Sequence, residues 1–278
     1  MAAVSTYVSV LSIAGSDSGA GAGIQADLKT FSALGCYGTT AITALTCQNT
    51  LGVGEIHPIP ANIVYQQIVA VLEDIKPAVV KIGMIPNAEV ALAVVSALSV
   101  YPHLKIIIDP VMISSTGKAL MEENASQVLI ESLFPIAALV TPNLVEASFL
   151  TNKTIASLAE MQVAARNILK FRSVAVLIKG GHLPGNELYD VFSDQFGREE
   201  IFHSTHIQSF NTHGTGCTLS SAIAAYLALG FELSDAIKKA KLFVHNAILE
   251  GVDVKTGGGT GPLNHFFAPE RLVKRNSN

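Results

Sequence analysis

The sequence has no tryptophan and few charged residues. Of its 278 residues only 14% are Lys, Arg, Asp or Glu, and the formal net charge is −4. Basic residues are scattered rather than gathered in a stripe, so we expect no nucleic-acid partner. The apolar runs are also too short for a membrane span, since the nearest candidate, 88–100, is short and contains Glu89. We therefore expect no membrane partner either.

Cysteine is scarce as well. The three thiols, Cys36, Cys47 and Cys217, have no metal-ligand spacing and cannot all pair with one another. No signal peptide is recognisable at the N-terminus. These features predict a reducing, cytoplasmic location.

Apolar residues, by contrast, make up 49% of the chain, and they fall into short runs that alternate with helical patterns. Apolar runs of this kind are typical of parallel strands buried on both faces. We expect strands at 8–14, 39–47, 78–82, 106–108, 138–140 and 174–178, and helices at 24–34, 61–74, 88–98, 124–133, 157–171, 218–229 and 235–249. Segments 188–192 and 200–203 are typical of an antiparallel hairpin. The pattern predicts a three-layer α/β fold with a mostly parallel sheet, forming one domain over residues 1–278.

Polar residues follow one predicted strand after another. They are Asp17, Gln48 with Asn49, Lys81, Asp109, Asn143 with Glu146, and Lys179. Ligands of such sheets bind at the carboxyl ends of the strands, so we expect these side chains to share one site.

The most informative segment, at residues 211–219, reads NTHGTGCTL. Gly214 and Gly216 precede an apolar helix, and Cys217 falls in its first turn. Unpaired N–H groups and the helix dipole attract anions at such a start, and a thiolate there can be stabilised. We therefore expect a phosphoryl-transfer site, although a tight turn and a small buried cysteine would have the same sequence.

Two other segments allow more than one interpretation. The glycine-rich residues 15–23 lack the Gly-Lys-Ser/Thr of a Walker A loop, and no acidic residue follows where a dinucleotide fold would hold a ribose. Asn143 and Glu146 are three residues apart at a helix start. They could hold a hydrated Mg²⁺ or could simply cap the helix.

Taken together, the motifs resemble those of the hydroxymethylpyrimidine/phosphomethylpyrimidine kinases, a family of the ribokinase-like superfamily. The matching segments are AGSD at 14–17, AGIQADLKTF at 22–31, QNT at 48–50, KIGM at 81–84, DPVM at 109–112, TPN at 141–143, KGGH at 179–182 and THGTGCT at 212–218. The resemblance extends from about residue 8 to about residue 266. It implies a ribokinase-like three-layer α/β/α sandwich, ATP and Mg²⁺ as cofactors, and a homodimer.

The resemblance also implies an activity in thiamine biosynthesis. ATP would phosphorylate 4-amino-5-hydroxymethyl-2-methylpyrimidine and then its monophosphate. The implied substrate contacts are Gln48, Asp27, Gly15, Ala22, Met84 and Val111. The implied nucleotide contacts are Asn143, Lys179, Thr212 and Thr215, and the implied metal contacts are Asp109 and Glu146. Catalysis would fall to Cys217, Gly214 and Gly216, with the thiol as base for the alcohol of the first step.

The chain departs from the family at several positions. The first glycine loop reads SGAG at 18–21, where the family more often has Ser-Gly-Gly. Ser115 stands where the family often has lysine, with Lys118 the nearest base, and Asn264 stands where it often has histidine. A pyridoxine or pyridoxal kinase is the alternative enzyme, because the two substrate rings are similar in size and polarity. An inactive ligand sensor of the same fold is the alternative outside the enzymes.

Overall fold

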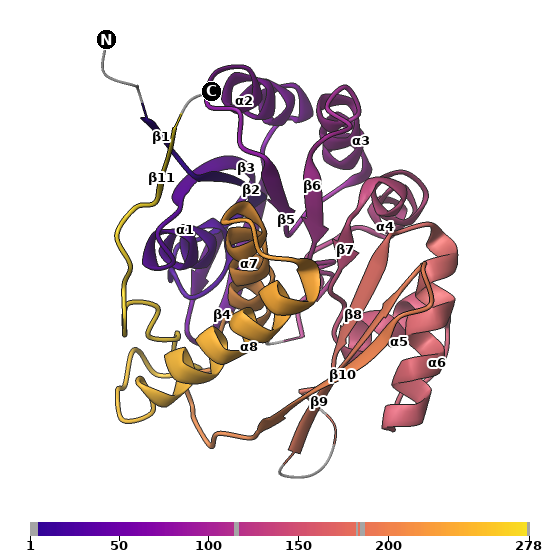
Figure 1. Ribbon diagram of the computed structural model, residues 1–278, viewed down its shortest axis with the longest axis vertical. Coiled ribbons are helices and arrows are strands. Elements are labelled where there is room, and N and C mark those ends of the chain that lie inside the picture. The colour runs from indigo at the N-terminus through magenta and orange to yellow at the C-terminus, as the bar shows by residue number, and fades with distance from the viewer. Residues whose placement is uncertain (1–4, 114–116, 182, 184–186, 277–278) are drawn as a thin grey trace.

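The structure, a computed structural model, describes residues 5–113, 117–181, 183 and 187–276. Its centre is a nine-stranded sheet with the strand order β10-β9-β8-β7-β6-β5-β2-β3-β4 (Figure 1). The strands are β2 (Ser9–Asp17), β3 (Tyr37–Asn49), β4 (Gly52–Pro58), β5 (Val79–Ile82), β6 (Lys105–Ile108), β7 (Leu139–Val140), β8 (Ala175–Lys179), β9 (Glu187–Asp194) and β10 (Glu199–Thr205). Strands β8, β7, β6, β5, β2 and β3 run parallel, while β4, β9 and β10 are antiparallel to their neighbours.

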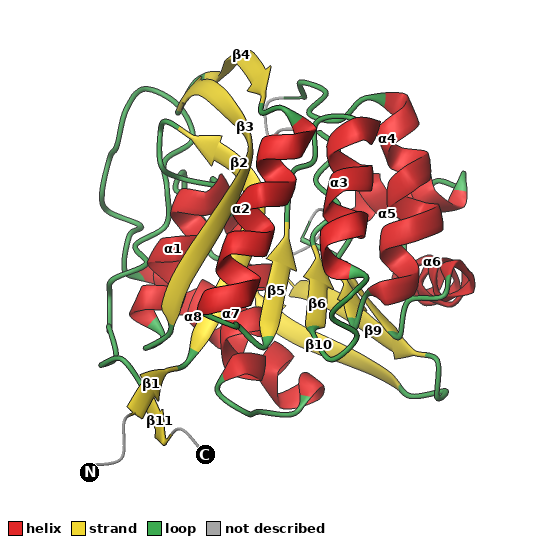
Figure 2. Cartoon of the chain, turned by 90° about the horizontal axis from the view of Figure 1, so that it is seen from above, coloured by secondary structure: helices red, strands yellow, loops and turns green. Residues whose placement is uncertain are grey.

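Helices cover both faces of this sheet (Figure 2). The first layer holds α2 (Ala61–Asp74), α3 (Ala88–Leu98), α4 (Glu123–Val128), α5 (Leu144–Thr151) and α6 (Leu158–Ile168). The second holds α1 (Gly23–Ala33), α7 (Thr215–Ala228) and α8 (Leu233–Leu249). The expected three-layer α/β fold is therefore confirmed.

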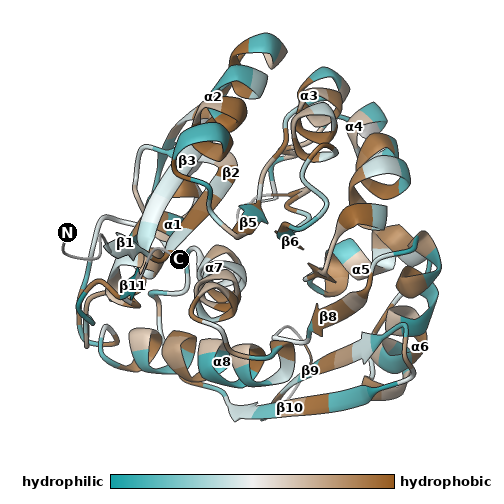
Figure 3. Cartoon of the chain, turned by 45° about the horizontal axis from the view of Figure 1, so that its top comes forward, coloured by the Kyte–Doolittle hydropathy of each residue, from teal (hydrophilic) through white to brown (hydrophobic). Residues whose placement is uncertain are grey.

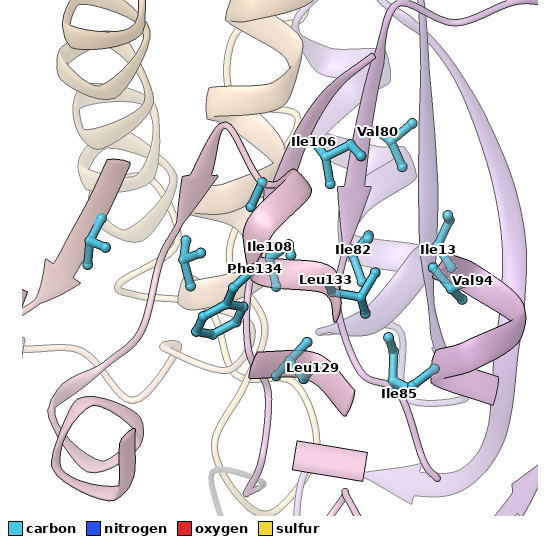
Figure 4. Packing of buried hydrophobic residues seen from close by; sticks show 14 of the residues in the cluster. Ile13, Val80, Ile82, Ile85, Val94, Ile106, Ile108, Leu129, Leu133 and Phe134 are labelled. Carbon is cyan, nitrogen blue, oxygen red and sulfur yellow. The ribbon is translucent and has the colours of Figure 1, made fainter. Parts of the chain in front are cut away.

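The strands show why both layers form. In β6, Ile106 and Ile108 pack under the first layer, whereas Ile107 packs under the second. Figure 4 shows Ile108 beside Phe134, and Ile106 near Val80, on the first of these faces. Successive side chains point to opposite faces, so a continuous apolar run supplies both cores. Figure 3 shows β8 largely in the hydrophobic colour for the same reason.

The structure corrects three details of the expected elements. Strand β4, which the sequence did not predict, contains two glycines and a proline, and its residues are exposed or half-buried at the sheet edge. The helix expected at 124–133 is α4 followed by a π-helical turn, Leu129–Leu133. Strands β1 (Ser5–Tyr7) and β11 (Lys274–Asn276) pair in a separate two-stranded sheet.

Ser157 is the N-cap of α6. Its Oγ accepts a hydrogen bond from the Glu160 N–H at 3.3 Å, and α6 begins at the next residue. No helix in the described part of the chain is long and apolar enough to cross a bilayer.

Candidate active site

A cavity of about 830 Å³ opens at the carboxyl ends of the central strands. It has the size expected for a site that holds small ligands. Its wall contains fourteen of the fifteen residues to which the sequence assigned a role: Gly15, Ala22, Gln48, Met84, Asp109, Val111, Asn143, Glu146, Lys179, Thr212, Gly214, Thr215, Gly216 and Cys217. The fifteenth, Asp27, is absent from the wall. The polar strand ends therefore meet in one place, as the parallel topology predicted.

The start of α7 forms part of the cavity wall. Gly214 caps the helix with φ of +86°, and a Cβ there would lie 1.8 Å from the Gly21 oxygen. Glycine alone permits both this conformation and this close contact. The first-turn N–H groups that follow, including those of Gly216 and Cys217, lack partners inside the helix and attract an anion.

The positively charged side chain of Lys179 lies directly beside this helix start. The Lys179 ammonium is 3.1 Å from the point where a Cβ on Gly216 would stand, and it bonds Asp109 Oδ1 at 2.7 Å. Burial lowers the pKa of Lys179, but Asp109 and Glu146 outweigh it and raise the pKa above its usual value. For Asp109, burial acts to raise the pKa of the carboxyl group, but the charges of Lys179 and Lys81 outweigh burial and hold that pKa below its usual value. Both groups are therefore charged at neutral pH.

Asn143 and Glu146 form the capping box that the sequence allowed. Asn143 Oδ1 accepts from the Glu146 N–H at 2.9 Å, and Glu146 Oε2 accepts from the Asn143 N–H at 2.7 Å. Burial raises the pKa of Glu146 to about 7; Lys179 opposes that rise and Asp109 adds to it. The two carboxylates thus compete for one ammonium.

Two carboxylates beside a single ammonium leave an excess of negative charge, which a divalent cation would offset. Among the described residues, no group of three or more His, Cys, Asp or Glu is placed to hold a metal by itself. Mg²⁺ usually keeps several waters and is bound through one or two carboxylates together with substrate phosphates. Glu146 and Asp109 are two carboxylates on one cavity wall, and a cation there would relieve their repulsion.

Cys217 differs from the expectation drawn from the sequence. Burial raises the pKa of its thiol to about 11, although Lys81 and the Gly23 N–H act in the opposite direction. Asp109 and Asp27 also contribute negative charge nearby. The helix start therefore does not yield a resting thiolate, and the thiol is neutral at pH 7.

The structure also corrects the role expected for Asp27. Its side chain is fully buried behind the cavity wall, and both carboxylate oxygens lie 2.9 Å from Lys81 Nζ. Ser12 and Ser221 donate to the same carboxylate at 2.5 and 2.6 Å. Asp27 therefore holds together β2, β5, α1 and α7, and it is not placed to contact a substrate directly.

The first glycine loop is organised by Asp17. Its carboxylate accepts the N–H groups of Gly19 at 2.8 Å, Gly21 at 3.0 Å and Ala22 at 2.8 Å. This loop contacts Gln48 through Ser18, whose Oγ accepts the Gln48 backbone N–H at 2.8 Å and donates to the Gln48 backbone oxygen at 2.7 Å. The loop and the end of β3 are thus fixed to one another.

The sequence missed the far end of the cavity. There the wall consists of residues from β10 and the segment after it, from α8, and from the loop near residue 260: Ser204, Thr205, His206, Ile207, Ser209, Lys241, Val244, His245, Ile248 and Thr260. The spacing of Lys241, Val244, His245 and Ile248 on one helix face was the only available signal. Ser115 lies outside the described residues, and Lys118 donates to the backbone oxygens of Val53 and Gly54.

Comparison with known proteins decides the family. The family model described as phosphomethylpyrimidine kinase matches residues 17–264. The chain belongs to this family. The hydroxymethylpyrimidine/phosphomethylpyrimidine kinase of Rhizobium meliloti is 48% identical over 92% of the chain and 96% of its own length. The chain spans about half the length of the bifunctional thiamine biosynthesis proteins that it also matches.

Solved structures agree with the family and the fold. A phosphomethylpyrimidine kinase from Clostridium difficile superposes with a TM-score of 0.77 at 42% identity, over 86% of this chain and 99% of the other. An ADP complex of Bacillus subtilis pyridoxal kinase superposes with a TM-score of 0.86 at 34% identity, over 94% and 98% of the two chains. The fold is thus shared with a phosphomethylpyrimidine kinase and with a pyridoxal kinase.

Proposed function

We propose that this protein transfers the γ-phosphoryl group of ATP to the hydroxymethyl group of 4-amino-5-hydroxymethyl-2-methylpyrimidine, and then to the resulting monophosphate. The observation that carries the proposal is one continuous cavity. It joins the Gln48 amide and the first glycine loop to the α7 start and Lys179. Relatives that align over nearly their whole length are named for this activity.

The pyrimidine binds at the Gln48 end of the cavity. An amide can offer both a hydrogen-bond donor and an acceptor to the aminopyrimidine edge. Met84 and Val111 supply apolar surface for the ring, and Gly15 and Ala22 leave room beside it. A Cβ on Gly15 would lie 2.9 Å from the Met84 sulfur, so this wall is already closely packed.

The nucleotide binds across the α7 start. Thr212, Thr215, Asn143 and Lys179 surround the place where its phosphates would lie. Bound Mg²⁺, held through Glu146 and Asp109, would neutralise charge on the phosphates. The N–H groups at the start of α7 and the Lys179 ammonium stabilise the phosphoryl group during transfer.

Cys217 is the proposed proton acceptor of the first phosphorylation. The alcohol must lose a proton, whereas the monophosphate oxygen of the second step is largely ionised because its second pKa is about 6. The thiol is neutral at rest, so this role requires the small fraction that is ionised. Lys81 is the nearby cation that favours that fraction.

A pyridoxine kinase activity is the second candidate. It is supported by the match to pyridoxal kinase structures over more than nine-tenths of the chain at 33–34% identity. We propose it as a weaker side activity, because pyridoxine lacks the exocyclic amine that Gln48 could bind.

Coupled ADP release with Mg-ATP tests the proposal. Hydroxymethylpyrimidine, its monophosphate, pyridoxine and ribose are supplied in parallel. We expect turnover on both pyrimidines, weak turnover on pyridoxine and none on ribose. Turnover mainly on pyridoxine would replace the proposed substrate, and no turnover on any alcohol would support an inactive sensor.

Three further expectations stay predictions: one domain over the chain, a homodimer, and a cytoplasmic location. Light scattering during gel filtration tests the dimer, limited proteolysis tests the single domain, and fractionation tests the location.

A further inference from the structure

His213 lies where three distant segments of the chain meet. Its Nε2 is 3.0 Å from Asp17 Oδ2 and 3.0 Å from Gln48 Nε2. Its Cδ2 is 2.3 Å from the point where a Cβ on Gly21 would stand, so the ring packs against the first glycine loop. His213 also directly precedes Gly214, the cap of α7. The side chain therefore contacts the pyrimidine end of the cavity, and the backbone that follows it leads into the α7 start.

The hydrogen between His213 and Asp17 belongs to the imidazole. The Asp17 carboxylate already accepts three backbone N–H groups, an arrangement that strongly favours its charged form. An ionised carboxylate has no proton to donate. His213 Nε2 must therefore carry the hydrogen, and a nitrogen that carries a hydrogen cannot accept one from Gln48.

The contacts of Thr46, on the other side of the Gln48 amide, also indicate that the amide oxygen and nitrogen should be exchanged. Its Oγ donates to the Ser16 backbone oxygen at 2.8 Å and lies 3.1 Å from Gln48 Oε1. A hydroxyl has one hydrogen, so with Ser16 satisfied Thr46 can only accept from the amide. Exchanging the amide oxygen and nitrogen removes both conflicts, because Oε1 then faces the His213 N–H, which it shares with Asp17 as a bifurcated donor, and Nε2 faces Thr46 Oγ. Such exchanges are decided by the hydrogen-bond network.

We propose that His213 is a positioning residue that holds the Gln48 amide with its oxygen toward the imidazole and its NH₂ toward Thr46. The amide then keeps one N–H and one oxygen lone pair that no other described residue uses. These match a ring nitrogen and the neighbouring exocyclic amine of the pyrimidine. The assignment rests on the proposed function, since it takes Gln48 as the residue that binds the aminopyrimidine. Through this contact the Asp17 loop controls substrate selection.

The kinetic test compares His213→Phe, which keeps an aromatic ring but removes the N–H, with His213→Gln, whose amide restores a donor. The exposed His103, changed to Phe, is the matched control. We expect His213→Phe to raise KM for hydroxymethylpyrimidine about tenfold, to lower selectivity over pyridoxine by a similar factor, and to leave KM for ATP within about twofold. His213→Gln should recover most of the loss, and His103→Phe should behave as the unmodified protein. An equal loss on pyrimidine and pyridoxine in His213→Phe would overturn the assignment, as would a failure of His213→Gln to recover.

A second readout is independent of catalysis. In protein labelled with ¹⁵N-histidine, the His213 signal is identified by its loss in His213→Gln. We expect Nε2 to bear the hydrogen, and a bare Nε2 would overturn the proposal. An unmodified protein that does not phosphorylate hydroxymethylpyrimidine would refute the proposed function instead, while the proton position would still test the His213–Asp17 arrangement.

Discussion

The pH dependence of the two phosphorylations tests Cys217 most directly. The pKa of its thiol is raised to about 11, so about one thiol in a thousand is ionised at pH 8 and about one in a hundred at pH 9. A base must be deprotonated to act. We therefore expect kcat/KM of the first step to rise about tenfold per pH unit over this range. The second step should stay flat, because its nucleophile is already ionised.

Glu146 and Lys179 do not account for a difference between the two steps in this pH range. The pKa of Glu146 is raised to about 7, so Glu146 is already ionised above pH 8, and both steps share it. The pKa of Lys179 is raised above its usual value, so Lys179 stays charged. The assay is coupled ADP release at pH 8.0, 8.5, 9.0 and 9.5, with each pyrimidine as substrate.

Cys217→Ala should remove the slope of the first step and lower its rate by about a hundredfold, the usual contribution of general-base catalysis. The second step should change by less than about threefold. Cys47→Ala is the control, because this exposed thiol is not part of the cavity wall. Equal losses in both steps, or a slope that survives in Cys217→Ala, would refute the base role and leave Cys217 as a packing residue.

Three more outcomes follow from contacts in and behind the cavity. Gly214→Ala should lower Tm more than Gly197→Ala, because both glycines have φ of +86° but only the first Cβ meets a backbone oxygen, at 1.8 Å; equal melting shifts would contradict this. Asp27→Asn should cost about 3–5 kcal/mol in urea unfolding by stranding the buried Lys81 ammonium, and adding Lys81→Met should recover much of that loss; no recovery would argue against the ion pair as the cause. Glu146→Gln should weaken activation by Mg²⁺ severalfold, and in the unmodified protein that activation should weaken as pH falls through about 7 and protonates the carboxylate. Mg²⁺ titrations at pH 6 and 8 measure this, and unchanged curves would remove Glu146 from the metal site.

The sequence predicted the parts of the fold and site that depend on local pattern. The run at 106–108 is followed by Asp109, and the helix expected at 218–229 is α7, which begins three residues earlier at Thr215, so both could be placed without knowing their neighbours. Parallel topology then brings strand ends together. This explains why nearly all of the expected residues line one cavity.

What depends on distant neighbours could not be predicted. Asp27 meets Lys81 across 54 positions of sequence, and no motif reveals that this carboxylate pairs with the lysine behind the cavity wall. The thiol pKa of Cys217 depends on how deeply α7 is buried, which outweighs the helix start. The far end of the cavity uses β10 and α8, whose residues there follow no phosphate or metal motif.

The order of the chain has a consequence for synthesis on the ribosome. Strands β2 to β8 emerge first, yet one of their faces is covered largely by α7 and α8, which begin only at Thr215 and Leu233. Until these helices are made, the apolar side chains of Val79, Ile107 and Leu177 lack the helices that will pack on them. Exposed apolar surface of this kind makes nascent chains prone to aggregate, so this face of the sheet is the one that needs chaperone protection during translation. Thr260, which also lines the cavity, emerges later still.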